Sequence, residues 1–358
     1  MKVLIAGGAG FIGSTIASAC LDAGVTPVIL DDLSTGRAEF VRDRIFYRGD
    51  IADRQLVDRI FAEHPDIEAT VHCAALIVVP DSVAHPLRYY RENVGKTVEF
   101  LDALVANGCD RFLFSSSAAI YQPGDDFAVD ETSPVAANSP YAHSKAMVEQ
   151  VLQDSARAYA LRVVSLRYFN PVGADPRMRT GLQLARPSHV LGKMIEATRT
   201  GEPFQVTGTD WPTRDGSGIR DYVHVWDLAE AHVEALRRFD TVLAPGRAGY
   251  EVVNLGTGNG TTVRELLTAF TNVLGRPIET RLSPRRPGDS AGTYTRSERA
   301  RELLGWQPRL SLEDGIRHSL QWAELRDSRL GAADQELSAA DSAADGHRPA
   351  LTPSPRSA

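Results

Sequence analysis

Short apolar runs alternate with amphipathic stretches through the first half of the chain. Six runs are nearly continuous in apolar residues, as expected of strands covered on both faces: residues 2–6, 26–31, 44–48, 67–73, 111–116 and 162–168. Helices with one apolar face are predicted between these runs, near 11–23, 53–63, 87–107 and 139–159. This repeated order of strand and helix predicts an α/β fold built on a doubly wound parallel sheet.

The pattern loosens from about residue 171, where prolines and glycines interrupt shorter elements. Helices are predicted near 226–238, 262–274 and 312–323. We expect a first domain at 1–170 and a smaller α/β lobe at 171–326, with segments near 220–250 able to pack back on the first domain. Beyond residue 327 the chain is rich in Ala, Ser, Asp and Pro, which predicts a disordered tail at 327–358.

Composition narrows the class of protein. The 358 residues carry a net charge of −7, which disfavours non-specific binding of nucleic acid. No apolar run is long enough to span a membrane. Cys20, Cys73 and Cys109 are widely spaced and show no metal-ligand pattern, nor do the nine histidines. We therefore predict a cytoplasmic protein with free thiols and no bound metal.

A glycine-rich turn joins the first predicted strand to the first predicted helix. Gly7 allows a tight turn, Gly10 lets the backbone approach a pyrophosphate, and Gly13 lets the helix pack on the strand. The phosphates would meet the helix N-terminus, which Phe11 and Ile12 continue. Together these features predict a Rossmann-type dinucleotide site.

Acidic residues after the next two strands indicate which dinucleotide binds. Asp31 lies 18 residues beyond Gly13 (31 − 13), where a carboxylate holds the adenosine ribose and repels a 2′-phosphate. This favours NAD, whereas the nearby Arg37 is the signal for NADP. Asp50, with Ile51, is placed to reach the adenine. Each aspartate has an alternative role as a turn or helix cap.

A second group of polar residues predicts the chemistry. Tyr141 and Lys145 stand four apart on one face of a predicted helix. A neighbouring ammonium favours the phenolate of a tyrosine, whose free pKa is about 10. Ser115, Ser116 and Ser117 end the fifth strand, at the sheet edge where ligands bind. Ser117, Tyr141 and Lys145 are thus the predicted catalytic group, although serines also simply terminate strands.

Longer stretches carry a family likeness. They read GGAGFIGS at 7–14, FSSSAAIY at 114–121, SPYAHSK at 139–145, LRYFNPVGADP at 166–176, GIRDYVHVWDLA at 218–229 and PRRPGD at 284–289. Over about residues 1–325 the chain resembles the extended short-chain dehydrogenase/reductase family, and within it the UDP-galactose (UDP-glucose) 4-epimerases. The resemblance implies NAD-dependent inversion of a UDP-hexose at C4 through a 4-keto sugar.

The resemblance also implies a role for each matching residue. Tyr141 is the base on the 4-hydroxyl, Lys145 holds the nicotinamide ribose, and Ser117 shares the hydroxyl's hydrogen bond. The remaining cofactor candidates are Asp32, Cys73, Ala74, Ala75, Asn93, Ser115 and Tyr168. The substrate candidates besides Ser117 are Asn170, His189, Arg220, Tyr222, Arg286 and Asp289, although both arginines also fit surface salt bridges.

Three positions depart from the family's pattern. Ile77 stands where a lysine usually touches the cofactor, and His189 replaces a familiar amide. Gly292 and Thr293 fall where some members carry a bulky wall of the sugar pocket, so a small side chain here would admit an N-acetyl group. The alternative substrates are therefore UDP-N-acetylhexosamine, UDP-glucuronate or another nucleotide sugar of a secondary pathway.

Two other classes of protein remain as alternatives. A nucleotide-sugar dehydratase would carry an acid and a base after the serine triplet, where this chain has Ala118 and Ala119; a reductase is the related alternative. A binding protein of the same fold would have no need of Ser117, Tyr141 and Lys145 together.

The resemblance implies a homodimer formed through two helices of each subunit. The apolar stripes near 87–107 and 139–159 fit that role, and they equally fit packing against the sheet.

Overall fold

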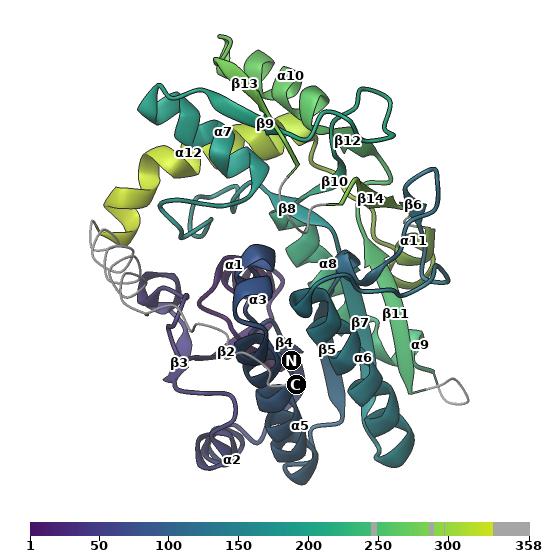
Figure 1. The fold of residues 1–358 in the computed structure, drawn as a ribbon. Coiled ribbons are helices and arrows are strands. Elements are labelled where there is room, and N and C mark those ends of the chain that lie inside the picture. Colours follow the sequence, from purple (N-terminus) through teal and green to yellow (C-terminus); the bar gives the residue numbers. More distant parts are fainter. Residues whose placement is uncertain (245–248, 286–289, 297, 332–358) are drawn as a thin grey trace, which may run out of the picture.

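The computed structural model describes residues 1–244, 249–285, 290–296 and 298–331. Its centre is a seven-stranded parallel sheet (Figure 1). The strands lie in the order β11 (Tyr250–Leu255), β7 (Arg162–Tyr168), β5 (Arg111–Ser117), β4 (Ile67–His72), β1 (Lys2–Ala6), β2 (Thr26–Asp31) and β3 (Ile45–Arg48). The six predicted strands all form, within a residue or so at each end, and the predicted doubly wound fold is confirmed.

Chain order reverses at β1. From this strand the chain moves outward through β2 and β3, then returns to β4 on the other side, and Ala6 pairs with both Leu30 and His72. The segments that follow β1 and β4 therefore lead away to opposite faces of the sheet, which opens a crevice of the kind that binds ligands in such sheets.

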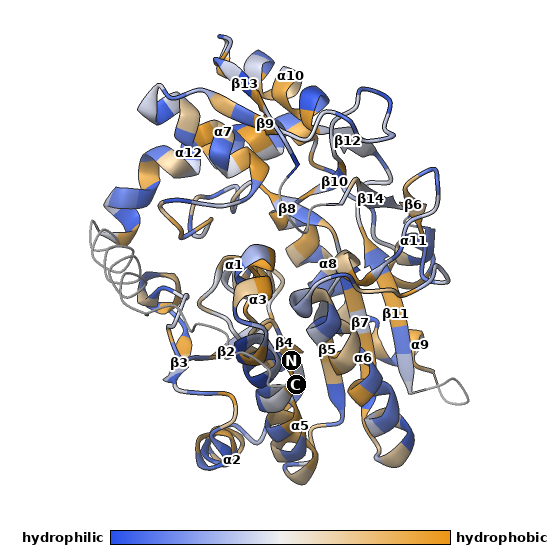
Figure 2. Cartoon of the chain, viewed as in Figure 1, coloured by the Kyte–Doolittle hydropathy of each residue, from blue (hydrophilic) through white to orange (hydrophobic). Residues whose placement is uncertain are grey.

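Helices cover both faces of the sheet. One face packs against α1 (Phe11–Asp22), α8 (Val225–Arg237), α9 (Phe239–Val242) and α11 (Glu298–Leu304). The other packs against α2 (Arg54–Glu63), α5 (Lys96–Ala106) and α6 (Pro140–Ala158). Figure 2 shows apolar positions along the strands and a mixture of apolar and polar positions on these helices. The continuous apolar runs follow from this burial on two sides.

The predicted helix at 87–107 forms, but it is not a regular α-helix throughout. After α3 (Val79–Ala84) the chain forms α4 (Pro86–Tyr89), a π-helical turn (Tyr90–Gly95) and then α5. The wider turn holds Asn93 against the backbone of Leu76, with hydrogen bonds of 2.8 and 3.0 Å. The π-helical turn thus coincides with a tertiary contact, and turns of this kind are frequent at functional sites.

The second lobe has its own sheet and core. β10 (Ile219–His224) pairs with β8 (Asn170–Val172), β12 (Gly260–Thr262) and β14 (Gly292–Thr295), and β14 pairs with the short β6 (Ala128–Val129). β9 (Phe204–Thr207) pairs with β13 (Thr280–Ser283). Helices α7 (Val190–Thr200), α10 (Val263–Leu274) and α12 (Leu312–Leu330) enclose the apolar core of this lobe. β6 comes from the first half of the chain and joins the second lobe's sheet, whereas β11 comes from the second half and joins the seven-stranded sheet. The chain thus crosses between the lobes more than once, and the domain boundary at residue 170 stays a prediction.

Helix α12 is longer than predicted. It continues through residues 327–330, because Leu330 is buried in the main core and its carbonyl accepts a 2.7 Å hydrogen bond from Arg37. The predicted tail thus begins at least four residues too early, and its remainder, 332–358, lies outside the described residues. Within the described ranges, no helix is both long and apolar enough to cross a membrane.

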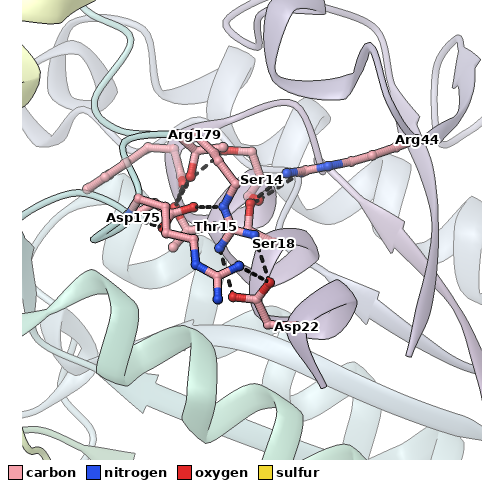
Figure 3. Close-up of polar contacts among 10 residues, drawn as sticks. Ser14, Thr15, Ser18, Asp22, Arg44, Asp175 and Arg179 are labelled. Atoms are coloured by element: carbon pink, nitrogen blue, oxygen red, sulfur yellow. Dashed lines mark hydrogen bonds and ion pairs between the residues drawn. The ribbon is translucent and has the colours of Figure 1, made fainter. Parts of the chain in front are cut away.

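A polar cluster ties α1 to the loop that follows β8 (Figure 3). The Arg179 guanidinium donates to both carboxylate oxygens of Asp22 on α1, at 2.8 and 3.0 Å, and also to Asp175 of its own loop. The hydroxyls of Thr15 and Thr180 lie 3.0 Å apart. These contacts fix the base of the second lobe against the helix that opens the predicted dinucleotide site.

Candidate functional site

The three glycines of the turn meet different constraints. At Gly7, where φ is +79°, an added Cβ would lie 2.5 Å from the Ala74 nitrogen. At Gly13 it would lie 2.2 Å from the Gly7 carbonyl oxygen. At Gly10 the nearest atom would be 3.6 Å away, which is ordinary contact. The fold itself therefore requires the first and third glycines, whereas the second keeps space open for a ligand.

The N-terminus of α1 is suited to an anion. Gly10 supplies no side-chain cap, and the first turn carries no acidic residue. Phe11 and Ile12 begin the helix there, so their N–H groups and the positive end of the helix dipole face the crevice above β1. A pyrophosphate fits this end of the helix.

Asp31 lies at the end of β2 and braces the glycine turn. Its carboxylate accepts hydrogen bonds from the N–H groups of Ala9 (2.9 Å) and Leu33 (2.8 Å). Burial raises its pKa, and the two backbone hydrogen bonds oppose that rise. Asp31 thus fills its alternative role as a turn cap, while two oxygens of a carboxylate keep further acceptor capacity for ribose hydroxyls.

The neighbouring residues bear on the choice between NAD and NADP. Asp32 is exposed and caps the backbone of Ser34 at 2.8 Å. The Arg37 guanidinium contacts Glu39 and the Leu330 carbonyl. Arg37 is therefore engaged by its own chain, which weakens the signal for a 2′-phosphate.

Asp50 is not the cap of the following helix. That cap is Asp53, whose carboxylate accepts from the Leu56 N–H at 3.1 Å. Asp50 instead accepts from the Ala52 N–H and pairs with Lys96 at 2.6 Å, while Ile51 is buried. The carboxylate therefore stays at the strand end, in the place predicted for an adenine contact.

The end of β4 lies beside the glycine turn. Cys73 donates its backbone N–H to the Ala6 carbonyl at 2.8 Å, and Ala74 and Ala75 continue along the crevice half-buried. Asn93, besides binding Leu76, donates to the Ser144 hydroxyl at 3.0 Å. Asn93 therefore fixes this edge of the predicted cofactor pocket to the helix that carries Tyr141.

Helix α6 begins where its sequence indicates. Ser139 caps the helix by accepting from the Ala142 N–H at 3.2 Å, and Pro140 occupies the first helical position. Tyr141 is consequently in the first turn and Lys145 is one turn further, facing the end of β5. The Lys145 ammonium donates to the Ser115 carbonyl at 2.8 Å and lies over the Phe114 ring.

The predicted catalytic group comes together in this buried environment. Burial raises the pKa of Tyr141, and a hydrogen bond from Ser117 opposes that rise. Burial lowers the pKa of Lys145 to about 8, against the opposing effects of Cys73 and Glu149. Tyr168 adjoins the group, and burial raises its pKa well above the usual range. The arrangement can hold a proton on Tyr141 and pass it to or from an adjacent hydroxyl.

Two substrate candidates lie side by side on the strands of the second lobe. Asn170 on β8 pairs in register with Tyr222 on β10. The Tyr222 hydroxyl is buried and has no hydrogen-bond partner within the described chain. A buried hydroxyl without a partner carries a free-energy cost that a bound ligand would remove.

The Arg220 guanidinium holds backbone carbonyls on both sides of the pairing between β10 and β14. It donates to the carbonyls of Ile219, Ala291 and Ser290 at 2.7, 2.7 and 3.2 Å. Arg286 and Asp289, the two remaining candidates, lie outside the described residues. Arg220 therefore anchors the segment that leads from their positions into β14.

Backbone geometry explains why a glycine, Gly292, lies at the predicted wall of the sugar pocket. Gly292 has φ of +115°, and an added Cβ would lie 1.7 Å from the Ile219 carbonyl oxygen and 1.8 Å from the Arg220 guanidinium. Parallel pairing of β14 with β10 thus requires glycine here. Its size gives no information on whether the pocket admits an N-acetyl group.

The other two departures from the family pattern lie on the surface. His189 caps α7, with Nδ1 accepting from the Gly192 N–H at 3.2 Å, and its side chain is exposed. Ile77 is 61% exposed. Neither side chain is packed into the core, so both positions are open to a ligand or a partner.

The sequence analysis missed three buried residues at the site. His232 on α8 donates from Nδ1 to the Leu228 carbonyl, so its Nε2 accepts from the Ser115 hydroxyl at 3.2 Å. Glu149 and Arg167 form a buried ion pair one turn of α6 beyond Lys145. Lys145 and Glu149 share the spacing of Tyr141 and Lys145, which was the one available clue.

Comparison with known proteins identifies the family. The model of the NAD dependent epimerase/dehydratase family matches residues 3–256. The chain belongs to this family, and the predicted cofactor, NAD, is thereby confirmed. It is similar to the UDP-glucose 4-epimerase of Azospirillum brasilense, with 40% identity over 335 residues that cover 93% of this chain and 94% of the relative. That of Rhizobium meliloti (strain 1021) is 41% identical over 326 residues, covering 91% and 98%.

Solved structures agree with these relatives. UDP-glucose 4-epimerase from Stenotrophomonas maltophila, with bound NAD and formylated UDP-arabinopyranose, is 36% identical with a TM-score of 0.84, covering 92% of this chain and 99% of that one. The Bifidobacterium longum enzyme, in complex with NAD+ and UDP, is 34% identical with a TM-score of 0.83, covering 90% and 98%. The resemblance to the UDP-galactose (UDP-glucose) 4-epimerases is confirmed.

Proposed function

We propose that this protein is an isomerase that interconverts UDP-galactose and UDP-glucose, with NAD as its cofactor. The observation that carries the proposal is the meeting of Ser117, Tyr141 and Lys145 beside the glycine turn, at the carboxyl edge of the parallel sheet. Relatives and structural neighbours that align over nine-tenths of the chain are UDP-glucose 4-epimerases.

Each part of the site has a task in this reaction. A bound NAD would supply the hydride acceptor and donor that the oxidation and re-reduction of the sugar's C4 require. Tyr141 takes the proton of the 4-hydroxyl, and Ser117 hydrogen-bonds the phenolic oxygen. Lys145, whose ammonium now donates to the Ser115 carbonyl, would bind the cofactor ribose. Asn170, Arg220 and Tyr222 supply contacts for the UDP moiety in the second lobe.

The division between the two lobes suits an inversion. The sugar has to present both faces to the cofactor in turn, so the enzyme must bind the nucleotide firmly and the sugar loosely. The polar candidates for nucleotide binding lie on β8 and β10, whereas the proton-transfer group lies on β5 and α6. This arrangement lets the UDP moiety stay in place while the sugar rotates.

The purified enzyme, incubated with UDP-galactose and without added NAD, tests the proposal. We expect UDP-glucose to appear at chromatographic separation, because the cofactor is regenerated in each cycle. Parallel reactions with UDP-N-acetylhexosamines and UDP-glucuronate measure the preference among sugars. Failure to interconvert UDP-galactose and UDP-glucose would contradict the proposal.

We also propose that the enzyme is a cytoplasmic homodimer. The two predicted apolar stripes each divide into a core side and a surface side. On α5, Leu101 and Leu104 are buried and Val98 is 43% exposed, while on α6 Leu152 is buried and Met147 is 47% exposed. Exposed apolar side chains on two neighbouring helices support an interface between copies of the chain.

Sedimentation at micromolar concentration tests the oligomeric state. We expect a dimer, near twice the chain mass of 39.0 kDa. The double substitution V98E/M147E should produce the monomer without unfolding it, since both side chains already contact solvent. A wild-type enzyme that sediments at 39.0 kDa would contradict the dimer.

A further inference from the structure

A continuous line of buried polar side chains runs from helix α6 to the second lobe. Its members come from α6, β7, β11 and the turn after β5 in the first domain, and from β14 and β10 in the second lobe (Figure 1). All are at most 5% exposed: Glu149, Arg167, Tyr121, Asn254, Thr295 and Asp221. Proton transfer as proposed above uses none of them.

The first half of the line begins beside the proton-transfer group. Glu149 accepts hydrogen bonds from the Ser116 hydroxyl at 2.5 Å and from Nε of Arg167 at 2.9 Å. Arg167 in turn donates from Nη1 to the Tyr121 hydroxyl at 2.8 Å. Since Glu149 is one helical turn from Lys145, and Ser116 lies between the two other serines of β5, this half holds α6 and β5 in register.

The second half reaches the strand that carries the substrate candidates. The Tyr121 hydroxyl donates to Oδ1 of Asn254 at 2.7 Å, and Nδ2 of Asn254 donates to the Thr295 hydroxyl at 3.1 Å. The Thr295 N–H donates to Oδ2 of Asp221 at 3.3 Å. Asp221 also accepts from the N–H groups of Thr257 and Gly258. It stands on β10 between Arg220 and Tyr222.

Burying a line of polar side chains costs desolvation free energy, so stability alone does not explain its presence. Well-packed apolar residues of similar volume are often equally stabilising or more so, whereas hydrogen bonds specify one relative geometry. The reaction proposed above needs such geometry, because the nucleotide is bound by one lobe and the proton is transferred in the other. A displacement of about 1 Å between reacting groups can reduce a rate on the order of a hundredfold.

We infer that this line fixes the second lobe relative to Tyr141 and Lys145, and that Tyr121 is the positioning residue at its joint. The inference rests on the proposed function, since positioning has a kinetic consequence only where both lobes hold one substrate. Tyr121 connects the two halves of the line, because its single hydroxyl accepts a hydrogen bond from Arg167 and donates one to Asn254.

Y121F tests the inference, because it removes this hydroxyl and keeps the ring. Tyr250 of β11 offers a control, since its hydroxyl is also buried and lies near Glu149 and Arg167 but forms no hydrogen bond with the line in the described chain. For Y121F we expect NAD content and UDP affinity within twofold of wild type, and kcat at least tenfold lower. Y250F should match wild type in all three measurements.

Amide hydrogen exchange of the protein with NAD and UDP provides a readout independent of turnover. Y121F should speed exchange in β10 and β14, and Y250F should not. Unchanged exchange in β10, or a lowered Tm with wild-type kcat per folded enzyme, would overturn the positioning role. A wild-type enzyme without epimerase activity would refute the proposed function instead, and the exchange result would still decide whether the line fixes the lobe.

Discussion

Alanine at Gly10 and alanine at Gly13 should have opposite consequences. Both residues belong to the same glycine-rich turn. An added Cβ would overlap atoms of the chain at Gly13 but not at Gly10. G13A should therefore damage the fold, whereas G10A should leave the fold intact and damage the binding of NAD.

The structure sets the magnitudes. At Gly13 the Cβ would approach the Gly7 carbonyl oxygen to 2.2 Å, more than 1 Å inside normal contact, and overpacking of this kind costs roughly 1–3 kcal/mol. Gly10 has φ −79° and ψ 174°, which alanine adopts freely. Losing one charge-assisted hydrogen bond to the pyrophosphate costs roughly 1.5–3 kcal/mol, which weakens binding by about 10- to 150-fold.

Two measurements on the same preparations separate the effects. Chemical unfolding of the NAD-free proteins should place G10A within about 1 kcal/mol of wild type, the range expected for a glycine-to-alanine change at a helix N-cap, and G13A clearly below it. Calorimetric titration with NAD should show the loss of affinity in G10A. If G10A bound NAD as tightly as wild type, the space left at Gly10 would not be the pyrophosphate site.

Further substitutions test the electrostatics of the site. Because burial lowers the pKa of Lys145 to about 8, K145M should stabilise the NAD-free protein by up to about 3 kcal/mol below pH 8. That gain should shrink as the pH rises from 8 toward 10.5, and a difference independent of pH would contradict it. E149A leaves Arg167 buried without its partner and should cost about 3–5 kcal/mol in urea unfolding. Y141F should abolish turnover while bound NAD, measured after denaturation, stays at the wild-type level. Y222F should keep wild-type stability, since its hydroxyl has no partner in the described chain, and should weaken UDP binding in a titration.

The fold was largely predictable because the apolar pattern within each strand indicates how that strand is buried. In β5, six of seven residues are buried, so the apolar run is continuous and its polar end marks the sheet edge. β6 has only two residues and pairs with β14, more than 160 positions away, so no local pattern indicates it. The π-helical turn was hidden for a similar reason, since it coincides with the contact between Asn93 and Leu76.

The site was predictable where one element fixes the geometry. The spacing of Tyr141 and Lys145 sets both on one helix face, and Ser139 with Pro140 sets where that helix begins. His232 could not be found in this way, because it meets Ser115 across 117 positions of sequence. Periodicity within one segment carries no information on which distant segment will pack beside it.

Gly292 illustrates how a fold constraint can imitate a specificity signal. A small residue at a sugar wall suggests a larger sugar only if the position is free to vary in size. Here the Cβ of any other residue would overlap the Ile219 carbonyl and the Arg220 guanidinium, which itself anchors the segment before β14. Glycine is therefore fixed by the pairing of β14 with β10, whichever sugar the enzyme accepts. The size of the sugar pocket must be set by side chains that the backbone leaves free, and Thr293, half-buried and next in the strand, is the first candidate to test by substitution.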